Sequence, residues 1–366
     1  MYTPKKKDYA YKFGCGRYIQ EQGAVKRTAA EVLRINCKKA VIVGGKTALS
    51  VALDKIKASL DEKNVGYEVA EHNGYCSFEA AEKISSFMKE SGCDIVIGVG
   101  GGKIMDLAKA IAAMADTPVI NIPTSAATCA ACTPLSVMYT EQGQTVPGST
   151  KHRLSVNAVL VDLDFMLTQP PRLLIAGAYD SMAKYIETAM RIKGKTEDEM
   201  QLGIDYAFLL SKQIYEDIRR LLPEALEALK NGVCTKAFEK LVYINLGVTG
   251  VISGIAKGSG QTAFAHEFYE AVRTVFTKEA ASFIHGELVG MALALQLHYN
   301  GEPENIAGIR ELLTEYGLPV FLRDINVEPS EENMKKLFDD MAATSSMEAE
   351  GEKGKAKLMD AIHVLV

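Results

Sequence analysis

The sequence predicts an α/β domain with a parallel sheet, followed by a domain made entirely of helices. In the first part of the chain, short apolar runs alternate with amphipathic helical stretches, as in strands joined by crossover helices. In the second part, nearly every segment has helical periodicity instead. We therefore divide the chain into residues 1–162, the α/β domain, and residues 163–366, the helical domain.

The strands expected in the α/β domain are short and apolar, because the strands of a parallel sheet are buried on both faces. The helices between them are expected where apolar residues recur at helical spacing, as Phe78, Ala81, Ile84 and Met88 do. In chain order, the pattern predicts a strand over 40–43, a helix over 47–62, a strand over 67–70, a helix over 77–91, a strand over 94–99, a helix over 103–115, a strand over 118–122 and a last strand over 159–161.

The helical domain is expected from the same periodicity, which continues almost to the end of the chain. One segment breaks it: residues 344–356 are rich in Ser, Glu, Gly and Lys, and we predict an exposed loop there. The predicted helices cover residues 171–192, 196–217, 223–229, 234–256, 261–275, 285–299, 304–316 and 330–342.

The bulk composition argues against several functional classes. The chain has 366 residues and a formal net charge of −5, whereas a nucleic-acid binder normally carries a basic face. We identify no signal peptide and no apolar run near the roughly 20 residues needed to span a membrane, so we expect a cytoplasmic protein. The seven cysteines do not suggest a disulfide framework in a chain of this length.

Cys129 and Cys132 form a CxxC pair. This spacing suits redox chemistry or half of a zinc site, but no second CxxC supplies two further ligands. The alternative is a pair of small, half-buried thiols in a loop.

A glycine-rich turn follows the strand over 94–99. Glycines at 98, 100, 101 and 102 leave room for a pyrophosphate to approach the backbone, and the helix that begins at Lys103 offers its amides to the anion. The spacing differs from the usual GxGxxG motif, so a purely structural turn is the alternative. Asp106 and Lys109 lie one helical turn apart, which predicts a surface ion pair.

The end of the first strand bears on the choice of nicotinamide cofactor. An acidic residue at that point would bind a ribose 2′-hydroxyl and repel a 2′-phosphate. This chain has Gly44, Gly45 and Lys46 there instead. Both NAD(H) and NADP(H) therefore remain open, and Lys46 favours NADP(H).

Three residues have local settings that suit ligands of a divalent metal: Asp180, His266 and His285. One carboxylate and two imidazoles suit Zn²⁺, Fe²⁺ or Mn²⁺, with zinc expected first, and three ligands leave a position open for substrate. Taken singly, Asp180 is also explained as a helix N-cap, and His266 as a hydrogen-bonded core residue. Together with the glycine-rich turn, they indicate a nucleotide-dependent metalloenzyme.

The chain resembles the iron-containing alcohol dehydrogenase superfamily, and within it the glycerol dehydrogenase branch. The resemblance implies the family's α/β nucleotide domain and helical metal-binding domain, a fold shared with dehydroquinate synthase. It also implies that Asp180, His266 and His285 bind the metal. It rests on the motifs at 100–109, 122–124, 135–139, 159–162, 176–180, 265–266 and 285–287. The cofactor contacts that it implies are Gly100, Gly101, Gly102, Lys103, Thr124, Thr128, Thr133, Leu135 and Tyr139.

The chain departs from this branch at three positions. Iron-type members place a His four residues after the metal Asp, where this chain has Lys184. Glycerol dehydrogenases carry a substrate-binding Asp where Cys129 stands here, and many relatives have a second His at the position of Tyr269 or Glu270. The loop around Cys129 and the presence of Lys184 are similar to the hydroxycarboxylate dehydrogenases.

These departures predict a substrate that carries a carboxylate. We expect interconversion of a 2-oxo acid and its 2-hydroxy acid, with the carboxylate held by Lys184 or Arg273, because a cation in place of an acid attracts such a group. The alternative for Lys184 is a surface ion pair with Glu187 or Glu267. The alternative functions are a polyol or hydroxyketone oxidoreductase, a lyase resembling dehydroquinate synthase, and a non-catalytic sensor. Relatives in the family self-associate, which implies a homo-oligomer with a small-molecule substrate.

Overall fold

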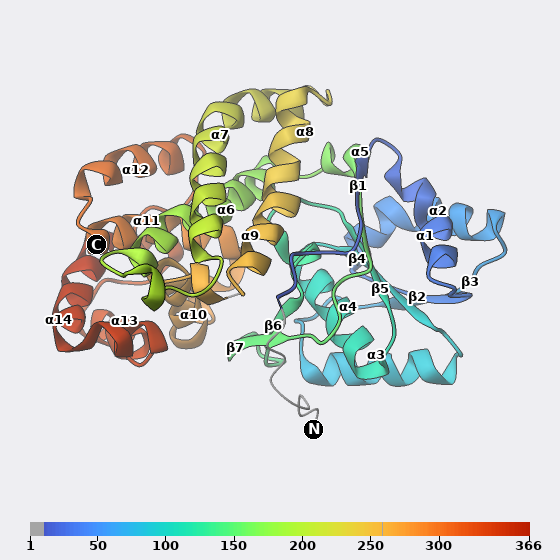
Figure 1. Ribbon diagram of the computed structural model, residues 1–366, viewed down its shortest axis with the longest axis horizontal. Helices are drawn as coiled ribbons and strands as arrows, with labels where there is room; N and C mark the ends of the chain where they lie inside the picture. Colours follow the sequence, from blue (N-terminus) through green and yellow to red (C-terminus); the bar gives the residue numbers. More distant parts are fainter. Residues whose placement is uncertain (1–10, 258) are drawn as a thin grey trace.

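The computed structural model describes residues 11–257 and 259–366. An α/β half and a helical half lie side by side, and the chain passes from one to the other where β8 ends (Figure 1). The predicted fold class, a parallel-sheet α/β domain joined to a helical domain, is confirmed. The strands are β1 (Tyr18–Glu21), β2 (Lys39–Gly44), β3 (Gly66–Glu71), β4 (Ile95–Gly100), β5 (Val119–Pro123), β6 (Leu135–Tyr139), β7 (Thr145–Lys151) and β8 (Ala158–Asp162).

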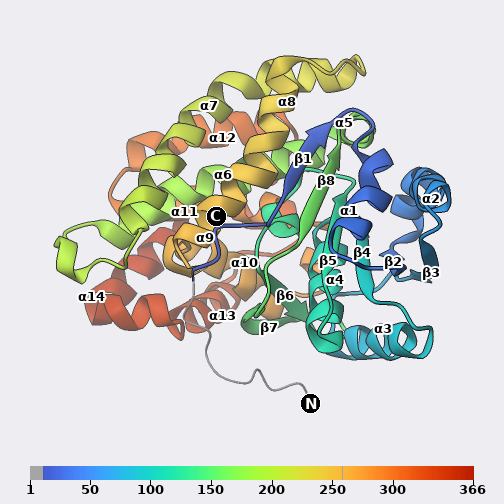
Figure 2. The same ribbon diagram turned by 45° about the vertical axis from the view of Figure 1, so that its right-hand side comes forward.

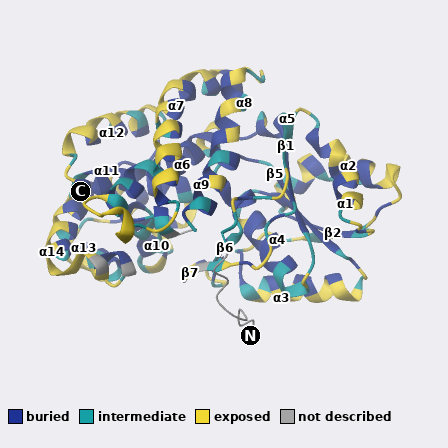
Figure 3. Ribbon diagram, viewed as in Figure 1, coloured by how far each residue is buried: buried dark blue, intermediate teal, exposed yellow. Residues whose placement is uncertain are grey.

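Six of these strands form one parallel sheet in the order β1-β8-β5-β4-β2-β3. Its central strands are buried on both faces (Figure 3). Between β2 and β4 the strand order reverses, and in such sheets ligands bind outside the carboxyl ends of the strands at that point. Four helices cover the two faces: α1 (Thr28–Arg34) and α2 (Lys46–Glu62) on one, α3 (Phe78–Glu90) and α4 (Gly102–Ala115) on the other.

The helical half is built around α11, which is apolar on all sides and almost completely buried. Its neighbours are α6 and α10, and α10 also contacts β7 of the α/β half. The helices are α5 (Leu163–Met166), α6 (Pro171–Ile192), α7 (Ile204–Lys230), α8 (Lys236–Tyr243), α9 (Thr249–Ile255), α10 (Phe264–Val275), α11 (His285–Asn300), α12 (Ile306–Glu315), α13 (Glu331–Ala342) and α14 (Ser345–Ile362).

Several elements differ from the sequence-based prediction, and the helices predicted over 196–217 and 223–229 form the single helix α7. The predicted loop over 344–356 belongs to helix α14, because Met347 and Leu358 are fully buried and tertiary packing outweighs the polar composition. The helix is kinked within this segment at Gly351, whose φ is 66°. The edge strand β1 and the hairpin β6–β7 were not predicted as strands. Strand β1 is polar and owes its conformation to pairing with β8, beside which it lies in Figure 2.

A continuous helical run from α8 to α9 has the length and composition of a membrane span. It covers Lys236–Ile255, with a mean hydropathy of 1.2, so the expectation that no segment reaches this apolarity is wrong. Of its most apolar window, 67% is buried inside the protein, which is typical of a core helix. A π-turn (Ile244–Val248) interrupts the run and directs Asn245 toward α6.

The ion pair between Asp106 and Lys109 is buried, so the prediction of a surface pair is wrong. Lys109 is 3% exposed, and its Nζ lies 2.8 Å from Asp106 Oδ1. The same ammonium donates hydrogen bonds to the carbonyls of Ala130 at 2.6 Å, Thr133 at 3.0 Å and Leu135. A single side chain of α4 therefore holds the loop that carries the CxxC pair.

His152, at the end of the hairpin next to this loop, makes the stability of the folded protein depend on pH. Its Nε2 lies 2.7 Å from Ser136 Oγ, and burial, followed by the charge of Lys109, lowers the pKa of His152 to about 3. An unfolded His has a pKa of about 6.5, so below that value protons bind the unfolded chain first and stability falls as the pH falls. Relative to His152→Gln, the wild-type free energy of unfolding should drop by about 1.4 kcal/mol per pH unit from pH 6.5 toward 3. Denaturant unfolding at several pH values measures this, and parallel curves for the two proteins would contradict it.

Gly177 allows α6 to pack directly on the loop after β5. A Cβ at this position would lie 1.9 Å from the carbonyl oxygen of Ala126, a backbone atom that Asn245 Nδ2 also binds at 3.0 Å. Gly177→Ala should therefore lower the free energy of unfolding by about 1–3 kcal/mol or more. Gly308→Ala is the matched control, because a methyl group added at that helical glycine would meet no atom of the described residues within 4 Å, and it should gain about 0.5–1 kcal/mol. Equal effects in chemical denaturation would refute the packing argument.

Candidate metal and nucleotide site

Three residues that are distant in sequence, and that were predicted as metal ligands, meet in space. Asp180 lies well inside α6, His266 lies in the first turn of α10, and His285 is the first residue of α11. One ligand atom from each lies within 4.8 Å of the other two. Because Asp180 is far from the start of its helix, the alternative that it caps the helix is wrong.

The donor set fits a divalent cation. Asp180 Oδ1 is buried and has no regular hydrogen bond within the described chain, although it forms an ion pair with Lys184 Nζ at 3.1 Å and has His266 Nε2 at 3.4 Å and His285 Nε2 at 3.6 Å. His266 Nδ1 lies 2.6 Å from Glu187 Oε2, so Nδ1 donates its proton to the carboxylate and Nε2 faces the cluster. A carboxylate behind a ligating imidazole is the common arrangement at metal sites, because it fixes the ring and its tautomer.

Lys184 belongs to this cluster, so the alternative of a surface ion pair is wrong. It is 3% exposed, and its Nζ lies 3.1 Å from Asp180 Oδ1 and 2.9 Å from His266 Nε2. Its charge thus balances Asp180, because the two residues lie four apart on the same face of α6. The ammonium stands beside two of the ligand atoms rather than pointing to the surface.

The charges in the cluster set its protonation states. Burial raises the pKa of Asp180, but the Lys184 ammonium and the two imidazoles outweigh it and hold that pKa well below its usual range. For His285, burial is the largest effect and its pKa is lowered. Burial also lowers the pKa of His266, yet the carboxylates of Glu187 and Asp180 together outweigh burial and the net pKa is raised. At neutral pH, Asp180 is ionised and His285 is neutral, which are the forms that bind metals.

Cys129 and Cys132 are buried, not half-buried as one alternative held. Burial, followed by the charge of Asp180, raises the pKa of Cys129 to about 11. Its thiol therefore stays protonated at neutral pH and is a poor nucleophile. The structure places Cys129 beside the cluster as a neutral side chain, and both cysteines are free thiols.

The glycine-rich turn lies between β4 and α4, as predicted. Gly101 is the N-cap of α4, and Gly100 has a φ of 156°, which favours glycine. A Cβ on Gly102 would lie 2.7 Å from Thr128 Cγ2, so the turn packs against the loop that follows β5. In the same place, Thr124 N donates to Gly100 O at 3.0 Å. Thr124 and Thr128 thus lie beside the glycines.

The residues after β2 lie next to this turn. Gly44 pairs with Val99 across the sheet, and Gly45 is the N-cap of α2. Lys46 is exposed, and its backbone amide donates to Asn73 Oδ1 at 2.8 Å. Because parallel strands end at one edge, the ends of β2 and β4 form one surface at the reversal point of the sheet.

A row of aromatic residues connects the glycine-rich turn with the cluster of Asp180, His266 and His285. Lys103 Nζ lies 4.2 Å from the Tyr75 ring, and that ring lies 5.7 Å from Tyr139. Tyr139 Oη lies 2.6 Å from Tyr269 Oη, and the Tyr269 ring lies 4.3 Å from His285. Of the remaining predicted cofactor residues, Thr133 and Leu135 bind Lys109 through their carbonyls.

Sequence reasoning missed two residues of the site. Glu187 lies seven residues after Asp180 and so was expected on the same helical face, but only as an ion-pair partner of Lys184 and not as the partner of His266. Its Oε1 also accepts the backbone amides of Ala263 at 2.8 Å and His266 at 3.0 Å. Tyr269 was noted only as a missing His. Its position three residues after His266 indicates the same face of α10.

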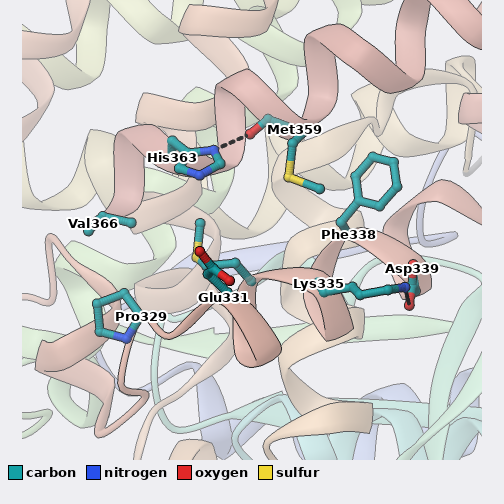
Figure 4. A pocket seen from close by; sticks show the side chains of 9 residues that line it. Pro329, Glu331, Lys335, Phe338, Asp339, Met359, His363 and Val366 are labelled. Atoms are coloured by element: carbon teal, nitrogen blue, oxygen red, sulfur yellow. Dashed lines mark hydrogen bonds and ion pairs between the residues drawn. The ribbon is translucent and has the colours of Figure 1, made fainter.

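A hollow elsewhere on the surface is separate from this site. It has a volume of about 440 Å³ and lies between α13 and the end of the chain, where His363 Nδ1 lies 2.7 Å from Met359 O (Figure 4). Phe338 and Met334 line it, and none of the predicted site residues does.

The comparisons with known proteins agree with this geometry. The model of the iron-containing alcohol dehydrogenase family matches residues 15–163. A glycerol dehydrogenase from Thermotoga maritima is 30% identical over 328 residues, covering 88% of this chain and 87% of that protein. Hydroxycarboxylate dehydrogenase A from Escherichia coli is 28% identical, covering 79% of this chain and 78% of that protein.

A solved structure has the same fold over nearly the whole chain. Glycerol dehydrogenase from Schizosaccharomyces pombe superimposes with a TM-score of 0.84 at 24% identity, covering 98% of this chain and 91% of that one. Sequence and fold therefore agree along both halves of the molecule, and the chain belongs to the iron-containing alcohol dehydrogenase family.

Proposed function

We propose that this protein is a metal-dependent, NAD(P)(H)-linked oxidoreductase that interconverts an alcohol and a carbonyl group in a small molecule. The observation that carries the proposal is the convergence of Asp180, His266 and His285, which a row of contacting side chains connects with the glycine-rich turn. A metal site and an anion-binding turn on adjoining surfaces are what hydride transfer to a polarised carbonyl requires.

The chain's own residues have separate tasks in this proposal. Asp180, His266 and His285 hold one divalent metal, zinc first and iron or manganese as alternatives, and Glu187 orients His266. When bound, the metal supplies Lewis-acid polarisation of a carbonyl oxygen. Three protein ligands leave a coordination position open for substrate.

The nicotinamide cofactor would lie along the carboxyl ends of β2, β4 and β5. Lys46, exposed at the end of β2, is compatible with a 2′-phosphate, so the proposal covers both NAD(H) and NADP(H). The residues proposed to hold the cofactor are Gly44, Gly45, Lys46, Gly100, Gly101, Gly102, Lys103, Thr124, Thr128, Thr133, Leu135 and Tyr139.

The hydroxyls of Tyr139 and Tyr269 are proton donors that lie near the cluster of Asp180, His266 and His285. Their oxygens lie 2.6 Å apart, and burial raises the pKa of both phenols. Both hydroxyls therefore remain protonated at neutral pH. In the proposed reaction, Tyr269, whose ring touches His285, keeps a proton close to the reacting oxygen.

A polyol or hydroxyketone is the substrate class that the relatives favour. Both the Thermotoga maritima relative and the Schizosaccharomyces pombe structure are named glycerol dehydrogenases. The expected 2-oxo acid becomes the second candidate, with one relative named hydroxycarboxylate dehydrogenase A. Its structural support is the pair of buried cations Lys184 and Arg273, together with the neutral Cys129. The lyase and the sensor remain alternative functions. That the protein is cytoplasmic and forms a homo-oligomer remains a prediction.

Removal of one ligand should abolish activity. In His285→Ala, we expect metal affinity to fall by about 100-fold or more, with no detectable cofactor oxidation, because two ligands hold a metal poorly. Metal content after dialysis and steady-state turnover measure the two effects. His298→Ala is the control. That imidazole lies on the same helix but outside the cluster, and its Nε2 lies 2.8 Å from Asp360 Oδ2. Full activity in His285→Ala or in metal-stripped protein would exclude the proposal.

A substrate panel separates the candidate classes. Metal-loaded protein should oxidise glycerol with NAD⁺ or NADP⁺, as the relatives' names indicate, and reduce dihydroxyacetone with NADH or NADPH in the reverse direction. Turnover confined to 2-oxo acids would establish the second candidate instead. The absence of turnover with the complete panel would reject both and favour the lyase or the sensor.

A further inference from the structure

Arg273 is a buried cation with two unused hydrogen-bond donors. The residue is 3% exposed, and its Nη2 donates to the carbonyl of Phe283. Its Nε and Nη1 have no hydrogen-bond partner within the described part of the chain. A buried charged donor left without an acceptor costs free energy, so such a group in a folded protein calls for an explanation.

The surroundings of Arg273 include a second cation, Lys103. Its guanidinium lies 5.9 Å from the Tyr269 ring, and the tyrosine row leads from there to Lys103. Burial, followed by the charge of Arg273, lowers the pKa of Lys103. In residues 11–257 and 259–366, neither Arg273 nor Lys103 forms an ion pair with a carboxylate. Arg273 is buried and Lys103 is exposed at the far end of the tyrosine row, so an anion bound near Arg273 would offset the buried charge.

We propose that Arg273 is an anion-binding residue of this site, and that its free donors receive an oxyanion from a ligand that extends along the tyrosine row toward Lys103. The proposal rests on the proposed function in one respect: the oxyanion is either the carboxylate of a 2-oxo acid or the diphosphate of the nicotinamide cofactor. Both carry oxygens that accept charge-assisted hydrogen bonds from a guanidinium, and because Nε and Nη1 lie on different edges of the group, they would donate to different oxygens.

The placement of Arg273 fits both sources. On one side, Tyr269 contacts His285 of the metal cluster, where a substrate carbonyl would lie. On the other side, Lys103 lies in the first turn of α4, whose amino-terminal end favours negative charge. Arg273 comes from the helical half and Lys103 from the α/β half, so a ligand that contacts both would join the two halves.

The test is direct binding of three probes to metal-loaded protein, measured by calorimetry. ADP-ribose carries the diphosphate, pyruvate carries the carboxylate, and hydroxyacetone has the shape of pyruvate without its charge. In Arg273→Met, the dissociation constant of ADP-ribose or of pyruvate should rise by about 10- to 100-fold, the usual effect of losing a charged hydrogen bond. Hydroxyacetone should bind unchanged, and Arg273→Lys should recover part of the loss. The probe whose dissociation constant rises shows whether Arg273 binds the diphosphate of the cofactor or the carboxylate of the substrate.

Arg310→Met is the matched control, because Arg310 also has an unpartnered Nε in the described chain and lies on α12, away from the site. Metal content of each variant shows whether the bond from Arg273 to Phe283 was needed to hold His285. The proposal is overturned if wild-type protein binds neither anion, if both dissociation constants are unchanged in Arg273→Met, or if hydroxyacetone weakens equally. Turnover of neutral substrates by the wild type tests the proposed function separately.

Discussion

The site depends on one buried carboxylate. Asp180 is 1% exposed, and an isolated ionised carboxylate in such a position would be strongly unfavourable. Three groups offset this cost: Lys184 on the same helix, and the imidazoles of His266 and His285 from two other helices. Helices α6, α10 and α11 therefore each place a side chain next to the Asp180 carboxylate. A divalent metal would compensate the charge of that carboxylate more completely than the Lys184 ammonium does.

The surrounding packing keeps these helices in register with the α/β half. Asn245 Nδ2 binds the carbonyls of Ala126 and Leu174, both at 3.0 Å, and so ties the loop after β5 to the start of α6. At the other end of that loop, the Lys109 ammonium donates hydrogen bonds to three backbone carbonyls. Buried polar side chains that bind backbone oxygens fix a loop more firmly than apolar contacts, because each lost bond leaves an unsatisfied group. The cofactor surface and the metal cluster are held together through these two residues.

Much of the fold, but less of the site, could be predicted from the sequence. The helix expected over 171–192 is observed as Pro171–Ile192, because its apolar face is long and a proline starts it. The convergence of Asp180, His266 and His285 was also anticipated, through the motifs around them. Burial of Lys184 was not, since the sequence does not show which helix covers a polar face. Arg273 was named as a possible carboxylate partner, but its unpaired donors appear only when the neighbouring loops are in place.

The measurement that tests the central claim most directly is X-ray absorption spectroscopy of zinc-loaded protein, which reports the elements bound to the metal. The account predicts one zinc with nitrogen and oxygen neighbours at about 2.0–2.2 Å, and with the multiple scattering of two imidazoles. A sulfur neighbour at about 2.3 Å would place the metal at the buried cysteines instead. Such a spectrum would contradict the assignment of Asp180, His266 and His285.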